Sequence, residues 1–180
     1  MENSILSREN IEIMKRLVEL FQVVLLIVAV AGLLQAGEGI PAVGTWKLNV
    51  AESKYSNGAL PKSATRTVEA NGDGVKVSYE YVESDGSVIK YGYTANFDEQ
   101  DSPISGSGAN WREQKVGGAD TIALRRLGSS AYGGALKKSG NVVMTTRTVV
   151  SKGGKVTTVT ANGGDAKGQP TKNVSVWDKQ

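Results

Sequence analysis

The 180-residue sequence contains no cysteine and no histidine. Without cysteine the chain cannot form disulfides, so its own core must hold it together, and it cannot carry a lipid on an N-terminal cysteine. Without histidine it lacks Ser-His-Asp and Cys-His catalysis, ordinary zinc sites and histidine-ligated haem. Several large classes of enzyme and metalloprotein are therefore excluded.

Charge of either sign is scattered along the chain and never gathers into a run. The whole sequence has 21 basic and 18 acidic residues, and residues 1–36 hold three of the former and four of the latter, which leaves residues 37–180 with a net charge of +4. Scattered charges are typical of a solvated surface. With no basic run, we expect no nucleic-acid partner.

The first 36 residues have the layout of a secretory signal peptide. Lys15 and Arg16 form a basic region, residues 20–36 carry no charge, and the Ala36-Gly37 step suits a signal peptidase. We therefore expect residues 1–36 to be a signal peptide, 37–43 a short linker and 44–180 one domain. The protein would then be exported, either to a periplasm or out of the cell.

Two alternatives concern this leader. An uncleaved helix would anchor the protein in the inner membrane and would be its one contact with lipid, although the densest apolar part, residues 23–34, is shorter than the roughly 20 residues of a spanning helix. A true start at Met14 would place the basic residues at the very N-terminus, where signal peptides carry them.

After residue 40 the sequence is a series of short segments with a two-residue period, separated by glycine-rich turns. Residues 75–81 and 89–97 alternate apolar with polar side chains, and residues 142–150 and 156–161 are rich in valine and threonine. Turns such as Asn71-Gly72-Asp73-Gly74 tolerate positive φ. The pattern predicts an all-β fold of about eight to ten strands in an antiparallel up-and-down barrel, because closure removes the sheet's edges.

Two segments depart from this pattern. Residues 98–118 are polar and glycine-rich, and we expect either a long loop or one weak strand at residues 102–106 followed by a mobile flap. Residues 51–55 could form a short helical turn, which Pro61 would keep from extending.

Gly44-Thr45-Trp46-Lys47-Leu48 opens the first expected strand, where Gly44 permits a tight bend and Trp46 fills the narrow end of the barrel. This Gly-x-Trp resembles the first strand of lipocalins and fatty-acid-binding proteins, the calycin barrels. The stretches GTWKLNVAESKYSNGALPKSATRT, ADTIALRRL and VVMTTRTVVSKGGKVTTVT resemble exported bacterial lipocalin-like domain proteins. The resemblance implies a barrel with a small apolar ligand inside it.

The chain also departs from these families. Its final strand reads NVSVWDKQ, which lacks the Arg-x-Tyr with which fatty-acid-binding proteins hold a carboxylate, so that clamp cannot be carried over. Lipocalins stack a late arginine on the first-strand tryptophan, and Arg147 is the candidate for that role here.

The candidate ligand-binding residues are aromatic or basic. The tyrosines Tyr79, Tyr81, Tyr91 and Tyr93 lie on one face of each of two neighbouring strands. They would line a cavity if that face points inward, or they would fill a collapsed core or form cross-strand pairs outside.

Arginines are the candidates for an ionic contact with a ligand. Arg125 and Arg126 must point to opposite faces of one strand. One reading places one of them inside, where it would attract an anion or pair with a carboxylate; the alternative is an exposed rim position. Arg147 and Arg66 have similar strand contexts.

No metal or cofactor is expected. Asn71-Gly72-Asp73-Gly74 and Asp98-Glu99-Gln100-Asp101 do not have the spacing of a calcium loop and read as turns. Lys152-Gly153-Gly154-Lys155 also reads as a turn, because no helix follows it.

Three functions remain open from the sequence. The first is non-covalent binding of a small apolar molecule, oriented by tyrosine and arginine. The second is a ligand-free structural or interaction protein of the envelope with a packed barrel. The third is a calycin-fold enzyme using Tyr, Asp, Glu or Arg, which no evident pair of carboxylates supports.

Overall fold

The computed structural model describes residues 39–56, 60–164 and 169–180. The predicted signal peptide, its alternative as a membrane anchor and the possible start at Met14 lie outside these residues. Within the described ranges, none of the helices has the length and apolarity needed to cross a membrane.

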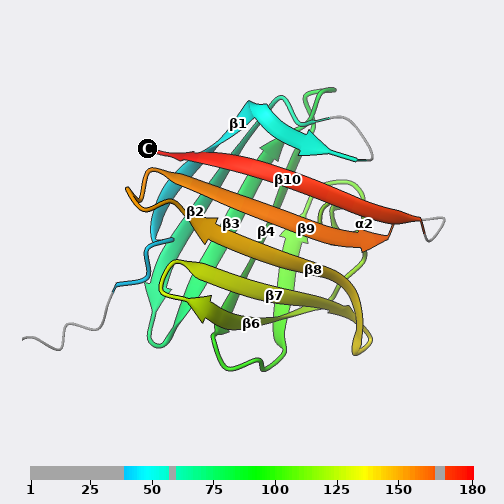
Figure 1. The fold of residues 1–180 in the computed structure, drawn as a ribbon. Helices are drawn as coiled ribbons and strands as arrows, with labels where there is room; N and C mark the ends of the chain where they lie inside the picture. The colour runs from blue at the N-terminus through cyan, green and yellow to red at the C-terminus, as the bar shows by residue number, and fades with distance from the viewer. Residues whose placement is uncertain (1–38, 57–59, 165–168) are drawn as a thin grey trace, which may run out of the picture. The chain divides into compact units, whose positions relative to one another are not determined.

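The described residues from Gly44 onward form a closed antiparallel barrel (Figure 1). Each strand pairs with its neighbours in the sequence, and the first pairs with the last to close the ring. The all-β, up-and-down barrel predicted from the two-residue period is confirmed. Its ten strands are β1 (Gly44–Tyr55), β2 (Ser63–Asn71), β3 (Gly74–Val82), β4 (Val88–Asn96), β5 (Ser102–Ser107), β6 (Thr121–Gly128), β7 (Ala131–Lys138), β8 (Asn141–Val150), β9 (Val156–Gly164) and β10 (Pro170–Lys179).

The alternation of side chains decides which residues enter the barrel. In β3, Val75 and Val77 are buried while Lys76 between them is exposed, as a pleated strand with one apolar face requires. The turn into β3 is the predicted Asn71-to-Gly74 hairpin, in which Gly72 has φ of 55°. Glycine adopts this conformation without steric cost.

Trp46 is fully buried near the start of β1. Its indole Nε1 donates a hydrogen bond to the Ala42 carbonyl at 2.9 Å, and Lys179 Nζ lies 5.3 Å from the ring centroid. The cation over this tryptophan is therefore Lys179, whereas the expected Arg147 lies exposed on β8. Gly44, two residues earlier, has φ of 137°, a conformation that favours glycine.

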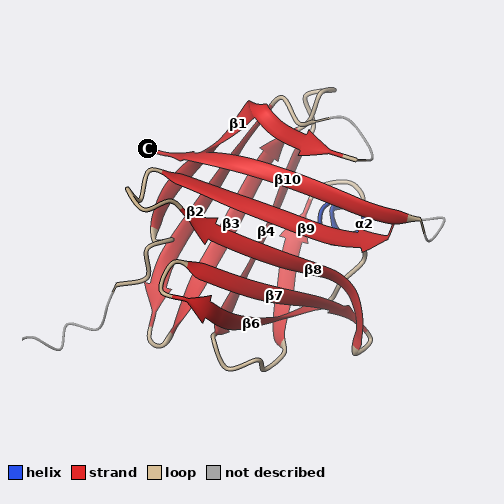
Figure 2. Ribbon diagram, in the orientation of Figure 1, coloured by secondary structure: helices blue, strands red, loops and turns tan. Residues whose placement is uncertain are grey.

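The region around residues 98–118 contains the weak strand that we expected, β5, but its second half is a helix. This helix, α2 (Trp111–Val116), ends at the C-cap residue Gly117, which has φ of 63°. A backbone N–H at this cap donates a hydrogen bond back to the first turn of the helix. Figure 2 shows α2 beside the strands at one end of the barrel. Six residues are too few to display a helical period, so the sequence pattern did not reveal it.

Residues 51–55 belong to β1, so the expected helical turn is wrong. The pairing of β1 with β10 shifts register between Asn49 and Lys54. Within this irregularity, Ser53 Oγ donates to the Asn49 carbonyl at 2.7 Å and accepts from Val176 N at 3.0 Å. A side chain thus replaces part of the backbone ladder and keeps the strand extended through a bulge.

Candidate functional site

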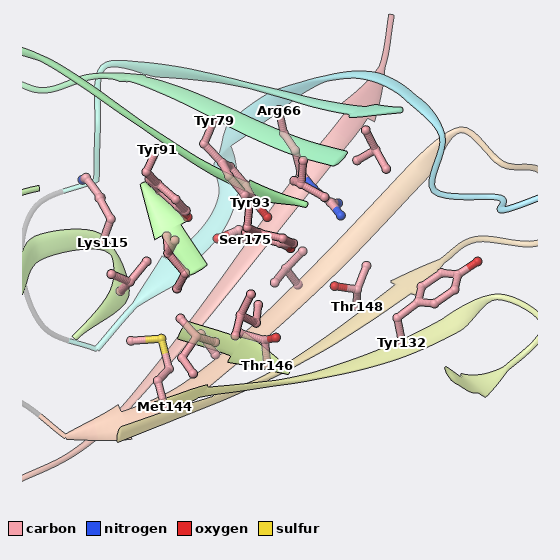
Figure 3. A pocket seen from close by; sticks show the side chains of 18 of the residues that line it. Arg66, Tyr79, Tyr91, Tyr93, Lys115, Tyr132, Met144, Thr146, Thr148 and Ser175 are labelled. Carbon is pink, nitrogen blue, oxygen red and sulfur yellow. The ribbon is translucent and has the colours of Figure 1, made fainter. Parts of the chain in front are cut away.

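The barrel encloses a cavity of about 450 Å³. Its lining comes from the inward face of the strands, together with α2 and the segment before β1. Figure 3 shows side chains from several strands converging on this space. The site is therefore built by the same alternation that builds the core.

One wall consists of four tyrosines from β3 and β4. Tyr79 and Tyr91 are directly opposite in the register of the two strands, and their rings stack with centroids 4.6 Å apart. Tyr81 stacks 6.0 Å from both of them, and Tyr93 also faces the cavity. The structure thus brings together on the inner face all four tyrosines singled out in the sequence, and Tyr79 and Tyr91 among them are direct cross-strand partners.

Burial favours the protonated form of three of these phenols. Removal from water raises the pKa of Tyr81 and Tyr91 well above the ordinary value of 10.0, and it does the same to Tyr93. The charge of Arg66 opposes this rise at Tyr81 and Tyr93, but desolvation is the larger effect. The wall is aromatic, uncharged and able to donate and accept hydrogen bonds.

Arg66 on β2 faces the same cavity. Its exposed fraction is 4%, and its guanidinium lies 5.7 Å from the Tyr79 ring centroid. Arg66 Nε and Nη1 are buried with no hydrogen-bond partner among the described residues. Figure 3 shows the guanidinium reaching into the cavity near Tyr79.

The other arginines singled out in the sequence lie elsewhere. Arg125 and Arg147 are exposed and do not line the cavity, and Arg126 is exposed with its guanidinium 4.6 Å from the Phe97 ring centroid. The internal arginine is Arg66. Its strand offered a signal, because Ala64 and Val68 share the inward face with Arg66 and are both buried.

A second ionic group lies at the α2 side of the cavity. Lys115 Nζ on α2 is 2.6 Å from Glu83 Oε1, with both side chains largely buried, and it lies 4.6 Å from the Tyr81 ring centroid. Both residues line the cavity. Since Glu83 is the one carboxylate among the described lining residues, these residues hold no pair of carboxylates for general acid–base chemistry.

The wall across the barrel from Arg66 is mainly aliphatic, although Tyr132 of β7 also lines it. Counting round the ring, β7 is five strands from β2 in either direction. Leu136 of β7 and the neighbouring Ile122 and Leu124 of β6 are buried and line the cavity there. The cavity therefore has one wall of phenols with a cation and an opposite wall that is mainly hydrocarbon.

No protein-family model and no curated protein sequence matches this chain. Among solved structures it is similar to the zebrafish ileal bile acid-binding protein complexed with cholic acid, with 11% identity, a TM-score of 0.46, and coverage of 78% of this chain and 99% of that one. At this degree of similarity the match carries no conclusion about a ligand.

Proposed function

We propose that this protein binds a small, largely apolar molecule non-covalently inside its barrel. The observation that carries the proposal is the cavity of about 450 Å³, since small-molecule sites span about 300–1,000 Å³. Stacked tyrosines on one side and Leu136 with its aliphatic neighbours on the other offer apolar contact, while phenol hydroxyls offer orientation. Such a lining is typical of ligand pockets.

The cavity also supports this function over the ligand-free alternative. A packed structural barrel would leave room for a few waters at most, and each water occupies about 30 Å³ of liquid. The observed volume of about 450 Å³ is well beyond that. A barrel that kept such a space empty would give up the contacts that normally stabilise a core.

The proposal is tested with the full chain and the uncharged fluorescent dye N-phenyl-1-naphthylamine. Thr146 of β8 lines the cavity, whereas its neighbour Thr145 points outward and is exposed. Thr146→Trp should weaken dye binding by roughly tenfold or more, because forcing atoms into occupied space costs about 1–3 kcal/mol. Thr145→Trp adds the same ring outside and should bind as the unmodified chain does.

This pair of variants also separates the barrel from other apolar parts of the chain. If the dye bound to residues 20–36 instead of the barrel, both variants would bind it equally well. Equal binding by both, or no binding by the unmodified chain, would reject the proposal in favour of a barrel without a ligand. Circular dichroism of each variant is the control that checks whether the barrel is retained.

A further inference from the structure

Arg66 is a buried cation that the described part of the protein leaves unneutralised. No carboxylate of the described residues lies within ion-pair distance of it, and its Nε and Nη1 have no hydrogen-bond partner there. An isolated charge removed from water is costly unless it is paired and hydrogen-bonded. The face of Tyr79 at 5.7 Å offsets only a part of this cost.

The neighbouring groups do not supply the missing negative charge. The pKa of Tyr81 and that of Tyr93 are raised by burial, so both phenols are neutral at physiological pH. Glu83 is already held by Lys115 at 2.6 Å. The ionic residues among the described lining are Arg66, Lys115 and Glu83, which gives the cavity wall one excess positive charge.

We infer that Arg66 forms an anion-binding subsite, and that the ligand of the proposed cavity is an amphipathic molecule with one anionic head group. The inference rests on the proposed binding function. Nε and Nη1 are unpartnered charged donors on different edges of the planar guanidinium, and each can donate a hydrogen bond to an oxygen of a carboxylate or of a related oxyanion.

The arrangement of the walls orients such a ligand. Its head contacts the guanidinium on β2, and its hydrocarbon part crosses the barrel to Ile122, Leu124 and Leu136. The Lys115–Glu83 pair does not compete for the head, because its charges neutralise each other. This subsite lies on the second strand and is distinct from the Arg-x-Tyr position on the final strand, which this chain lacks.

The test compares decanoate with decanol as competitors of N-phenyl-1-naphthylamine on the full chain. The two molecules share a hydrocarbon tail and differ in the charge of the head. Decanoate should displace the dye at a concentration at least about tenfold lower than decanol does. The reason is that hydrogen bonds between charged groups are strong enough to change an affinity by this factor. Acetate should displace nothing, because the anion alone lacks the tail.

Variants assign this preference to a residue. Arg66→Met should abolish the preference for decanoate while the neutral dye still binds, and should leave the ligand-free protein as stable as before or more so, because a buried unpaired charge is removed. Arg66→Lys keeps the charge and should keep part of the preference. Arg125→Met removes an exposed arginine outside the cavity and should behave as the unmodified chain.

The outcomes are separable. If the dye binds but decanoate and decanol compete equally, or if Arg66→Met keeps the preference, the anion subsite is wrong and the proposed function stands. If the unmodified chain binds no dye, the proposed function fails and the anion subsite fails with it.

Discussion

Gly44 shows at the scale of one residue how the chain enters its barrel. Its φ of 137° lies where side chains are disfavoured, and a Cβ at this position would meet Lys179 Cε at 2.8 Å. Lys179 is also the side chain that lies over the buried Trp46. A single glycine thus allows the bend into β1 and leaves space for the lysine that covers the tryptophan.

Gly44→Ala should therefore destabilise the protein by about 1 kcal/mol or more, because alanine at positive φ is strained and the lysine must move. The measurement is urea unfolding followed by tryptophan fluorescence. Gly153→Ala is the matched control, since a Cβ there meets nothing within 4 Å and no positive φ is involved. Equal stability of the two variants would contradict the role given to Gly44.

Arg66 and Arg125 show where single-residue reasoning from the sequence stops. Both lie in strands with a two-residue period, and the choice between them depends on which face turns inward. The buried partners of Arg66, Ala64 and Val68, carry that information, but a charged residue between small apolar ones is an unusual core pattern. The sequence therefore favoured Arg125 as a ligand contact, although its side chain is exposed in the structure. The structure was needed to identify Arg66 as the internal arginine.

At the scale of elements, β3 and β4 form the aromatic wall and α2 packs against it. Trp111 of α2 stacks on Tyr91 with centroids 6.2 Å apart, and Lys115 of the same helix pairs with Glu83 just beyond the end of β3. One short helix thus backs Tyr91 with an indole ring that does not itself line the cavity, and adds the cation of Lys115 to the lining. The tyrosines were predictable from alternation along two strands, whereas α2 was not, because its contacts are tertiary.

The tyrosine wall predicts a loss of stability in alkali. Burial raises the pKa of Tyr81, Tyr91 and Tyr93 above the ordinary value of 10.0 that they regain on unfolding. The folded state then binds more protons than the unfolded state above pH 10, so the free energy of unfolding must fall as the pH rises through that range. It should be unaffected by these groups below pH 9 or so, where phenols are protonated in both states.

Ultraviolet absorbance of phenolate, recorded with circular dichroism along the same alkaline titration, checks this. The buried tyrosines should ionise only as the barrel unfolds, and Tyr93→Phe should make the decline in stability above pH 10 less steep. Ionisation of all six tyrosines with the ordinary pKa and an unchanged barrel spectrum would contradict the buried wall.

At the scale of the whole barrel, closure explains why opposite walls can differ. Ten strands in sequence order place β2 and β7 across from each other, so a basic residue and an aliphatic surface face one another over the same cavity. The number of strands and their order follow from the spacing of turns and the apolar alternation. The size of the cavity does not, because it depends on how the rings of Tyr79, Tyr81 and Tyr91 stack against each other across the strands.

The most direct measurement of the central claim is a titration of the full chain with N-phenyl-1-naphthylamine, followed by amide NMR. If the interior is the binding site, the largest shifts should fall on residues that line the cavity, such as Val77, Tyr93 and Leu136. The outward neighbours Lys76 and Thr94, both exposed, should shift far less. Shifts confined to outward positions or to residues 20–36 would show that the barrel holds no ligand and would contradict the account.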